Sequence, residues 1–175
     1  MADCEFLAKW RVERFNSTDW DWARGHTYKG HMARVLAGWN FLASEPYQDS
    51  ESFLRCLYDT MDLEPILVGD FPSEKDSYGF FLKLTYLAAL THDLGKSGGE
   101  FQHMLHAKEQ AYQDNRSLGY AALKAATEAA QHKQAYRHEY LSAILMSKHP
   151  AIRGWIKGLV GEMGLWYVIG GAFGH

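Results

Sequence analysis

The chain of 175 residues has 47% hydrophobic residues and 22% charged residues, with a formal net charge of -3. This length and apolar content predict a single globular domain over 1–175. The net charge does not indicate a nucleic-acid binder, which would usually be basic, so any binding of nucleic acid must be local. Cys4 and Cys56 are too few for a disulfide framework, and no stretch is typical of a signal peptide or a membrane span, so we expect a cytoplasmic protein without membrane contacts.

Apolar residues recur at three- and four-residue spacings between a few turn-forming segments, which predicts a mostly helical chain and an all-α fold. Gly69, Pro72 and Ser73 indicate a loop over 63–76, and the glycines at 95, 98 and 99 indicate a break. The predicted helices cover 27–42, 50–61, 80–91, a segment that starts near 100, 118–135, 137–148 and 151–163. The helix over 80–91 is strongly apolar, so we expect it to be buried.

His92 and Asp93 stand side by side where this apolar helix ends. A buried carboxylate without a partner costs several kcal/mol, so a buried Asp93 requires a cation nearby. A divalent metal ion would meet that need, with neutral histidines completing its coordination. The alternative is a surface turn in which both side chains are solvated.

Further histidines lie on other predicted helices. His31 has apolar neighbours on the helix over 27–42, and His138 begins the helix over 137–148. Either could be an ordinary core or capping histidine, but imidazoles on separate helices can converge on one interior point of a bundle. His175 is a fourth candidate, because it follows a run of small residues that permits close backbone approach.

Three local patterns together resemble the HD superfamily of phosphohydrolases, and within it the nuclease domain of the CRISPR-associated helicase-nuclease of type I systems. The patterns are His92-Asp93-Leu94-Gly95-Lys96 followed by Phe101-Gln102, then Arg137-His138-Glu139-Tyr140-Leu141-Ser142-Ala143, and finally Ala172-Phe173-Gly174-His175. The resemblance covers residues 26–175. It implies an HD-domain helical bundle with an interior metal site.

By this resemblance, His31, His92 and Asp93 would hold one divalent metal ion, and Asp93, His138 and His175 a second, with Asp93 as the bridge. The ligand types do not distinguish among Mn, Fe, Co, Ni, Mg and Zn. The resemblance implies an endonuclease of antiviral defence that cleaves single-stranded DNA with water as nucleophile. A CRISPR effector complex and a helicase would be its partners, and Lys96 would contact a phosphate oxygen. The alternative for Lys96 is a solvated lysine in a glycine-rich turn.

The family's motif continues past the position of His175 with a second histidine and a later aspartate. We therefore expect the chain to be the N-terminal part of a longer protein. The alternative is an incomplete site with weak or partial metal occupancy. Two other functions stay open: a nucleotide phosphohydrolase of the wider HD superfamily, and a scaffold module whose metal site has decayed.

Two further motifs carry less weight. His103 and His106 have the i, i+3 spacing of a chelating pair, although a solvated helix face explains them as well. Gly95-Lys96-Ser97 is similar to the end of a phosphate-binding loop. Such a loop also requires a glycine five residues before Gly95, and that position is occupied by Leu90. The sequence therefore does not predict ATP binding.

Overall fold

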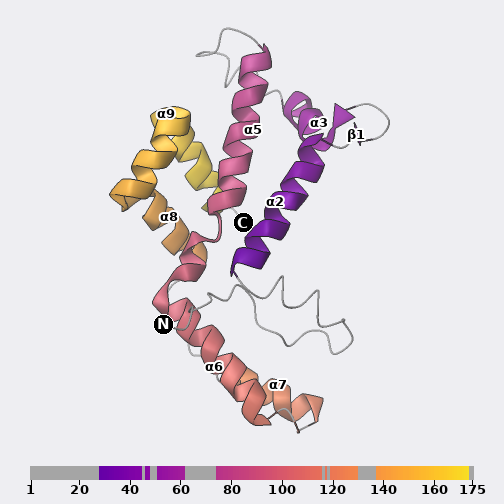
Figure 1. Ribbon diagram of the computed structural model, residues 1–175, viewed down its shortest axis with the longest axis vertical. Helices are drawn as coiled ribbons and strands as arrows, with labels where there is room; N and C mark the ends of the chain where they lie inside the picture. The colour runs from indigo at the N-terminus through magenta and orange to yellow at the C-terminus, as the bar shows by residue number, and fades with distance from the viewer. Residues whose placement is uncertain are drawn as a thin grey trace. The chain divides into compact units, whose positions relative to one another are not determined.

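The computed structural model describes residues 28–44, 46–47, 51–61, 74–115, 117, 119–129 and 137–173, and this part of the chain is predominantly helical (Figure 1). In chain order the elements are α2 (Tyr28–Ser44), β1 (Pro46–Tyr47), β2 (Glu51–Ser52), α3 (Phe53–Thr60), α5 (Glu74–Thr91), the 3₁₀ helix η2 (Leu94–Ser97), α6 (Gly99–Asn115), α7 (Tyr120–Ala129), α8 (His138–Lys148) and α9 (Pro150–Phe173). The expected all-α class is confirmed at this level, with one short hairpin of β1 and β2 added.

The chain divides into two compact units, and boundaries between them fall within α2 and within α8. The first unit contains the described residues of 28–34 and 93–142. The second contains those of 35–92 and 143–173.

The core of the second unit forms where α5 packs against α9. Leu87 on α5 is buried, as are Leu165 and Val168 on α9. The two backbones approach closely, since a β-carbon at Gly171 would lie 3.2 Å from that of Ala88. The expected burial of the helix over 80–91 is thus confirmed for one of its faces.

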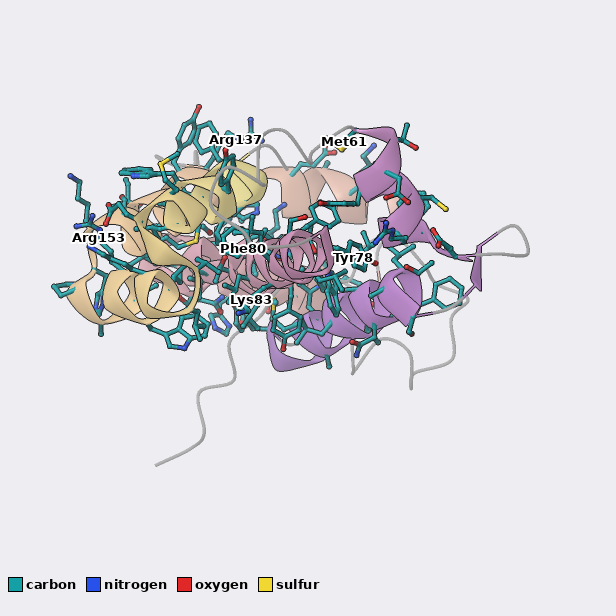
Figure 2. All side chains as sticks on the ribbon, turned by 90° about the horizontal axis from the view of Figure 1, so that it is seen from above. Met61, Tyr78, Phe80, Lys83, Arg137 and Arg153 are labelled. Atoms are coloured by element: carbon teal, nitrogen blue, oxygen red, sulfur yellow. The ribbon has the colours of Figure 1, made fainter. Side chains whose placement is uncertain are left out.

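The aromatic side chains of α3 and α5 extend this core. Tyr58 is buried and hydrogen-bonds Ser77, and its ring lies 5.4 Å from that of Phe81. The guanidinium of Arg55 lies 4.9 Å from the ring centre of Tyr78, which Figure 2 labels together with Phe80. Ser52 caps α3 by accepting a hydrogen bond from the backbone N–H of Arg55.

Helix α9 differs from its prediction, because it continues beyond 163 as far as Phe173. Its backbone kinks at Gly161, whose φ of 73° and ψ of -178° are open essentially to glycine alone. Beyond the kink, Leu165 and Val168 are buried against the core of the second unit. Tertiary packing therefore extends the helix beyond the glycines at which the sequence pattern predicts its end.

In the first unit, η2 follows Asp93 and leads into α6, which packs against α7. Phe101, Met104 and Leu105 form a buried apolar cluster on α6. The predicted helix over 118–135 is seen as α7, and 130–136 lie outside the described residues. Within the described ranges, no helix combines the length and the apolar character needed to cross a membrane.

Candidate metal site around Asp93

Asp93 is fully buried, with a side-chain exposure of 0%, and His92 beside it is 8% exposed. The alternative of a solvated surface turn is therefore excluded. Asp93 is the N-cap of η2, and its carbonyl oxygen accepts a hydrogen bond from the backbone N–H of Lys96 at 2.9 Å. The short 3₁₀ turn thus places the ammonium of Lys96 over the carboxylate of Asp93.

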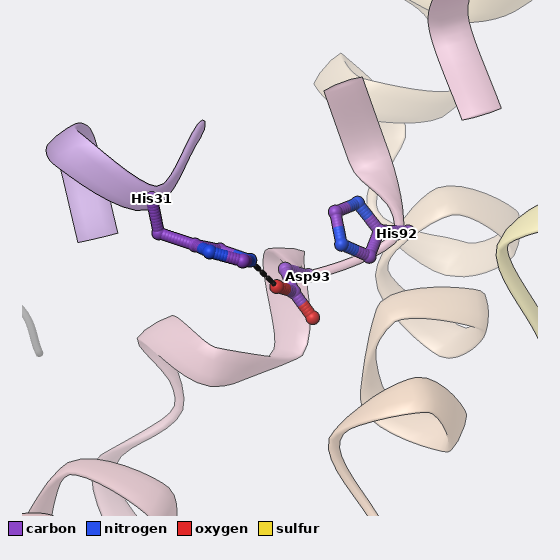
Figure 3. Close-up of side chains that lie close together, drawn as sticks. All are labelled: His31, His92 and Asp93. Atoms are coloured by element: carbon purple, nitrogen blue, oxygen red, sulfur yellow. Dashed lines mark hydrogen bonds and ion pairs between the residues drawn. The ribbon is translucent and has the colours of Figure 1, made fainter. Parts of the chain in front are cut away.

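Side chains of the first unit surround the Asp93 carboxylate. His31 Nε2 lies 2.6 Å from Oδ2, as the dashed line in Figure 3 marks, and Lys96 Nζ donates to the same oxygen at 2.6 Å. His138 Nε2 lies 3.2 Å from the other oxygen, Oδ1. The structure therefore brings together His31, Asp93 and His138, as the sequence predicts.

His92 supplies another imidazole next to Asp93. Its Nδ1 lies 2.8 Å from the carbonyl oxygen of Ala89, which can only accept a hydrogen bond, so this nitrogen carries the proton. In the neutral ring the lone pair is then on Nε2. Metal-binding histidines are commonly fixed in this way by a backbone carbonyl.

His31, His92 and Asp93 each offer one ligand atom, and these atoms lie within 4.8 Å of one another (Figure 3). These three residues could hold a metal ion. The fourth predicted ligand, His175, lies outside the described residues.

The environment of Lys96 differs from both expectations, which were a contact with a phosphate oxygen and a solvated lysine in a glycine-rich turn. It is 8% exposed and forms an ion pair with Asp93, so it is neither solvated nor directed to an open surface. Its backbone carbonyl accepts a hydrogen bond from the buried side chain of Gln102 at 2.6 Å. Because two buried opposite charges in contact offset part of each other's desolvation cost, Lys96 helps to explain how Asp93 can be buried.

The first turn of α8 is fixed directly on η2. A β-carbon at Gly95 would lie 1.9 Å from the carbonyl oxygen of His138, so only glycine fits there without displacing α8. Ser142 Oγ accepts from the backbone N–H of Gly95 at 2.8 Å and donates to the His138 carbonyl at 3.0 Å. These contacts hold His138 beside Asp93.

Glu139 adds a buried carboxylate beside His138, and its Oε1 lies 3.6 Å from His138 Nε2. Arg137 hydrogen-bonds both of its oxygens, at 3.2 and 3.3 Å. Burial raises the pKa of Glu139, but hydrogen bonds from its own backbone N–H and from Arg137, with the charges of His138 and Arg137, outweigh burial and lower it. Glu139 is therefore a second anion close to the site.

Two aromatic side chains complete the surroundings. The Phe101 ring lies 5.3 Å from the imidazole of His138, which limits how that ring can move. Burial, and then the charge of Asp93, raise the pKa of Tyr28 to about 12, so its phenol stays protonated near neutral pH. No site role was predicted for Tyr28, Gln102, Glu139 or Ser142, although the last three lie within the motifs of the sequence.

His103 and His106 lie on an exposed face of α6. Their exposure supports the interpretation that this pair lies on a solvated helix face.

Comparison with models of known protein families, with curated proteins and with solved structures found no match. The resemblance to the HD superfamily therefore rests on the local motifs and on the residues that they contain.

Proposed function

We propose that this chain binds divalent metal at Asp93 and hydrolyses phosphodiester bonds, as an HD-type nuclease does. The observation that carries the proposal is the buried Asp93 carboxylate, which His31 and His138 contact from two separate helices. An interior carboxylate with several imidazoles around it is costly to build and is typical of a metal site rather than of a core.

The donor atoms suit this proposal. His31, His92 and Asp93 offer two imidazole nitrogens and one carboxylate oxygen, a set that binds Mn, Fe, Co, Ni or Zn ions. Three protein ligands leave coordination positions for water and a substrate oxygen. His138 Nε2, which has no hydrogen-bond partner among the described residues, is the donor that we assign to a second ion.

A bound divalent ion would supply an activated water and stabilise charge on the phosphate oxygens. The residues of the chain prepare the site for it. Asp93 provides the negative charge, and Ala89 orients the ring of His92 through its carbonyl group. Arg137 keeps the carboxylate of Glu139 hydrogen-bonded beside the site.

Single-stranded DNA is the substrate that we propose, since it is the substrate that the resemblance implies. The same resemblance suggests a CRISPR effector complex and a helicase as partners. A nucleotide phosphohydrolase with the same ligands would release phosphate or pyrophosphate from nucleotides and would leave plasmid DNA intact.

The test is an assay with Mn²⁺ or Ni²⁺ on labelled single-stranded DNA, plasmid DNA and a set of nucleotides. We expect cleavage of single-stranded DNA, and a loss of at least roughly 100-fold in Asp93→Asn and His31→Ala. His103→Ala, in which the changed histidine is exposed, should keep its activity. Nucleotide hydrolysis alone would favour the phosphohydrolase, and absence of both metal binding and cleavage would refute the metal-dependent enzyme and favour the scaffold module.

A further inference from the structure

Lys96 and His31 contact the same carboxylate oxygen. Both Lys96 Nζ and His31 Nε2 lie 2.6 Å from Oδ2 of Asp93. That carboxylate also belongs to the group of ligand atoms that could hold a metal ion. The ammonium group of Lys96 therefore already lies on one oxygen of a carboxylate that could hold an ion.

The Lys96 side chain is positioned for this contact by the turn that carries it. Lys96 follows Asp93 by three residues in η2, and its backbone N–H is hydrogen-bonded to the Asp93 carbonyl. Gln102 holds the Lys96 carbonyl from α6. The contact is thus part of a folded turn rather than the chance position of a surface lysine.

Two cations compete for this carboxylate, the ammonium group of Lys96 and a divalent ion. A divalent ion binds a carboxylate oxygen at about 2.0 to 2.2 Å, and two positive charges on one buried oxygen repel each other strongly where water does not screen them. We infer that Lys96 is the resident cation of the metal-free site, and that a divalent ion displaces its ammonium group from Asp93 in order to bind. This inference rests on the proposed function and assigns the control of metal affinity to Lys96.

Displacement also connects two roles of Lys96. In the metal-free site its charge stabilises the buried Asp93 carboxylate. Once displaced, the same charge becomes available to an anionic substrate, the role that the HD resemblance implies. Lys96 therefore sets how tightly the site holds its metal.

The test is titration of the metal-free protein with Mn²⁺ by calorimetry, in wild type and in Lys96→Met. Removing the competing charge should lower the Kd for Mn²⁺ at least tenfold, while the melting temperature without metal falls. Lys96→Arg keeps the charge and should bind Mn²⁺ no more tightly than wild type. Lys83→Met removes an exposed lysine of α5, labelled in Figure 2, and should change neither quantity.

The outcomes separate this inference from the metal site itself. If Asp93→Asn abolishes Mn²⁺ binding but Lys96→Met binds no more tightly than wild type, the metal site stands and the competition is refuted. If neither the wild type nor any variant binds Mn²⁺, both the proposed function and this inference are refuted.

A measurement on the wild-type protein decides the matter even if Lys96→Met does not fold. Reductive methylation followed by mass spectrometry reports which lysine amines are accessible. Lys96 should be protected without metal and become methylated in saturating Mn²⁺, whereas the exposed Lys157 should be methylated in both states. Equal protection of Lys96 in both states would overturn the displacement.

Discussion

Gly95 and His138 touch through their main chains, and a β-carbon at Gly95 would lie 1.9 Å from the His138 carbonyl oxygen. This contact fixes the first turn of α8 against η2, and with it the imidazole of His138 beside Asp93. The rigidity of the site therefore depends on the absence of one side chain.

Gly95→Ala should force η2 and the first turn of α8 apart, at a cost of about 1–3 kcal/mol in unfolding free energy. Gly99→Ala is the matched control, since a β-carbon there meets nothing within 4 Å. Urea denaturation of both variants tests this. Equal losses of stability in the two variants would contradict the close contact.

Ser142→Ala should remove the acceptor for the backbone N–H of Gly95 and cost about 1–3 kcal/mol, because that buried N–H is left unsatisfied. Among the described residues, the hydroxyl of Ser147, further along α8, hydrogen-bonds only the Ile144 carbonyl of its own helix. Ser147→Ala should therefore cost less than about 0.5 kcal/mol in unfolding free energy. Hydrogen exchange at the Gly95 amide should accelerate in Ser142→Ala alone. Unchanged exchange would show that Ser142 does not hold this turn.

Two glycines of α9 should respond to alanine with opposite signs. Gly161 has a φ of 73°, so Gly161→Ala should destabilise the protein by about 1–3 kcal/mol. At Gly158 a β-carbon meets nothing within 4 Å, so Gly158→Ala should stabilise the helix by about 0.5–1 kcal/mol. Thermal unfolding of both variants is the measurement, and a stabilised Gly161→Ala would contradict the kink.

Arg137→Met should raise the pKa of Glu139, because burial remains while the hydrogen bonds from the guanidinium are lost. In the wild type the pKa is lowered on folding, so the pair stabilises the fold above the ordinary glutamate pKa of about 4.3. That stabilisation is lost as the pH falls through the lower folded-state value. Carboxyl NMR titration in the presence of EDTA measures the shift, and Arg34→Met, at an exposed position, should leave it unchanged.

Much of the helical layout is predictable from the sequence. The expected ends of the helices over 27–42 and 137–148 agree with α2 and α8 to within two residues, because turn-forming residues and proline follow them. The hairpin of β1 and β2 was missed, since two residues per strand give no alternating pattern. The extension of α9 was missed because burial of Leu165, a tertiary effect, outweighs the glycine signals.

The gathering of His31, His92 and His138 around Asp93 was predicted from the sequence, but the charge balance of this group was not. The apolar helix before His92 indicates that Asp93 is buried and needs a cation. The sequence does not show that Lys96 supplies one, because this depends on the 3₁₀ turn after Asp93 and on the direction of the Lys96 side chain. The role of Glu139 depends likewise on the three-dimensional position of Arg137.

The most direct test of the metal site is an anomalous difference map from crystals grown with saturating Mn²⁺. A peak within about 2.0–2.2 Å of a carboxylate oxygen of Asp93, and at bonding distance from His31, is the predicted result. A map without a peak beside Asp93, with the ammonium of Lys96 still on the carboxylate, would contradict the account.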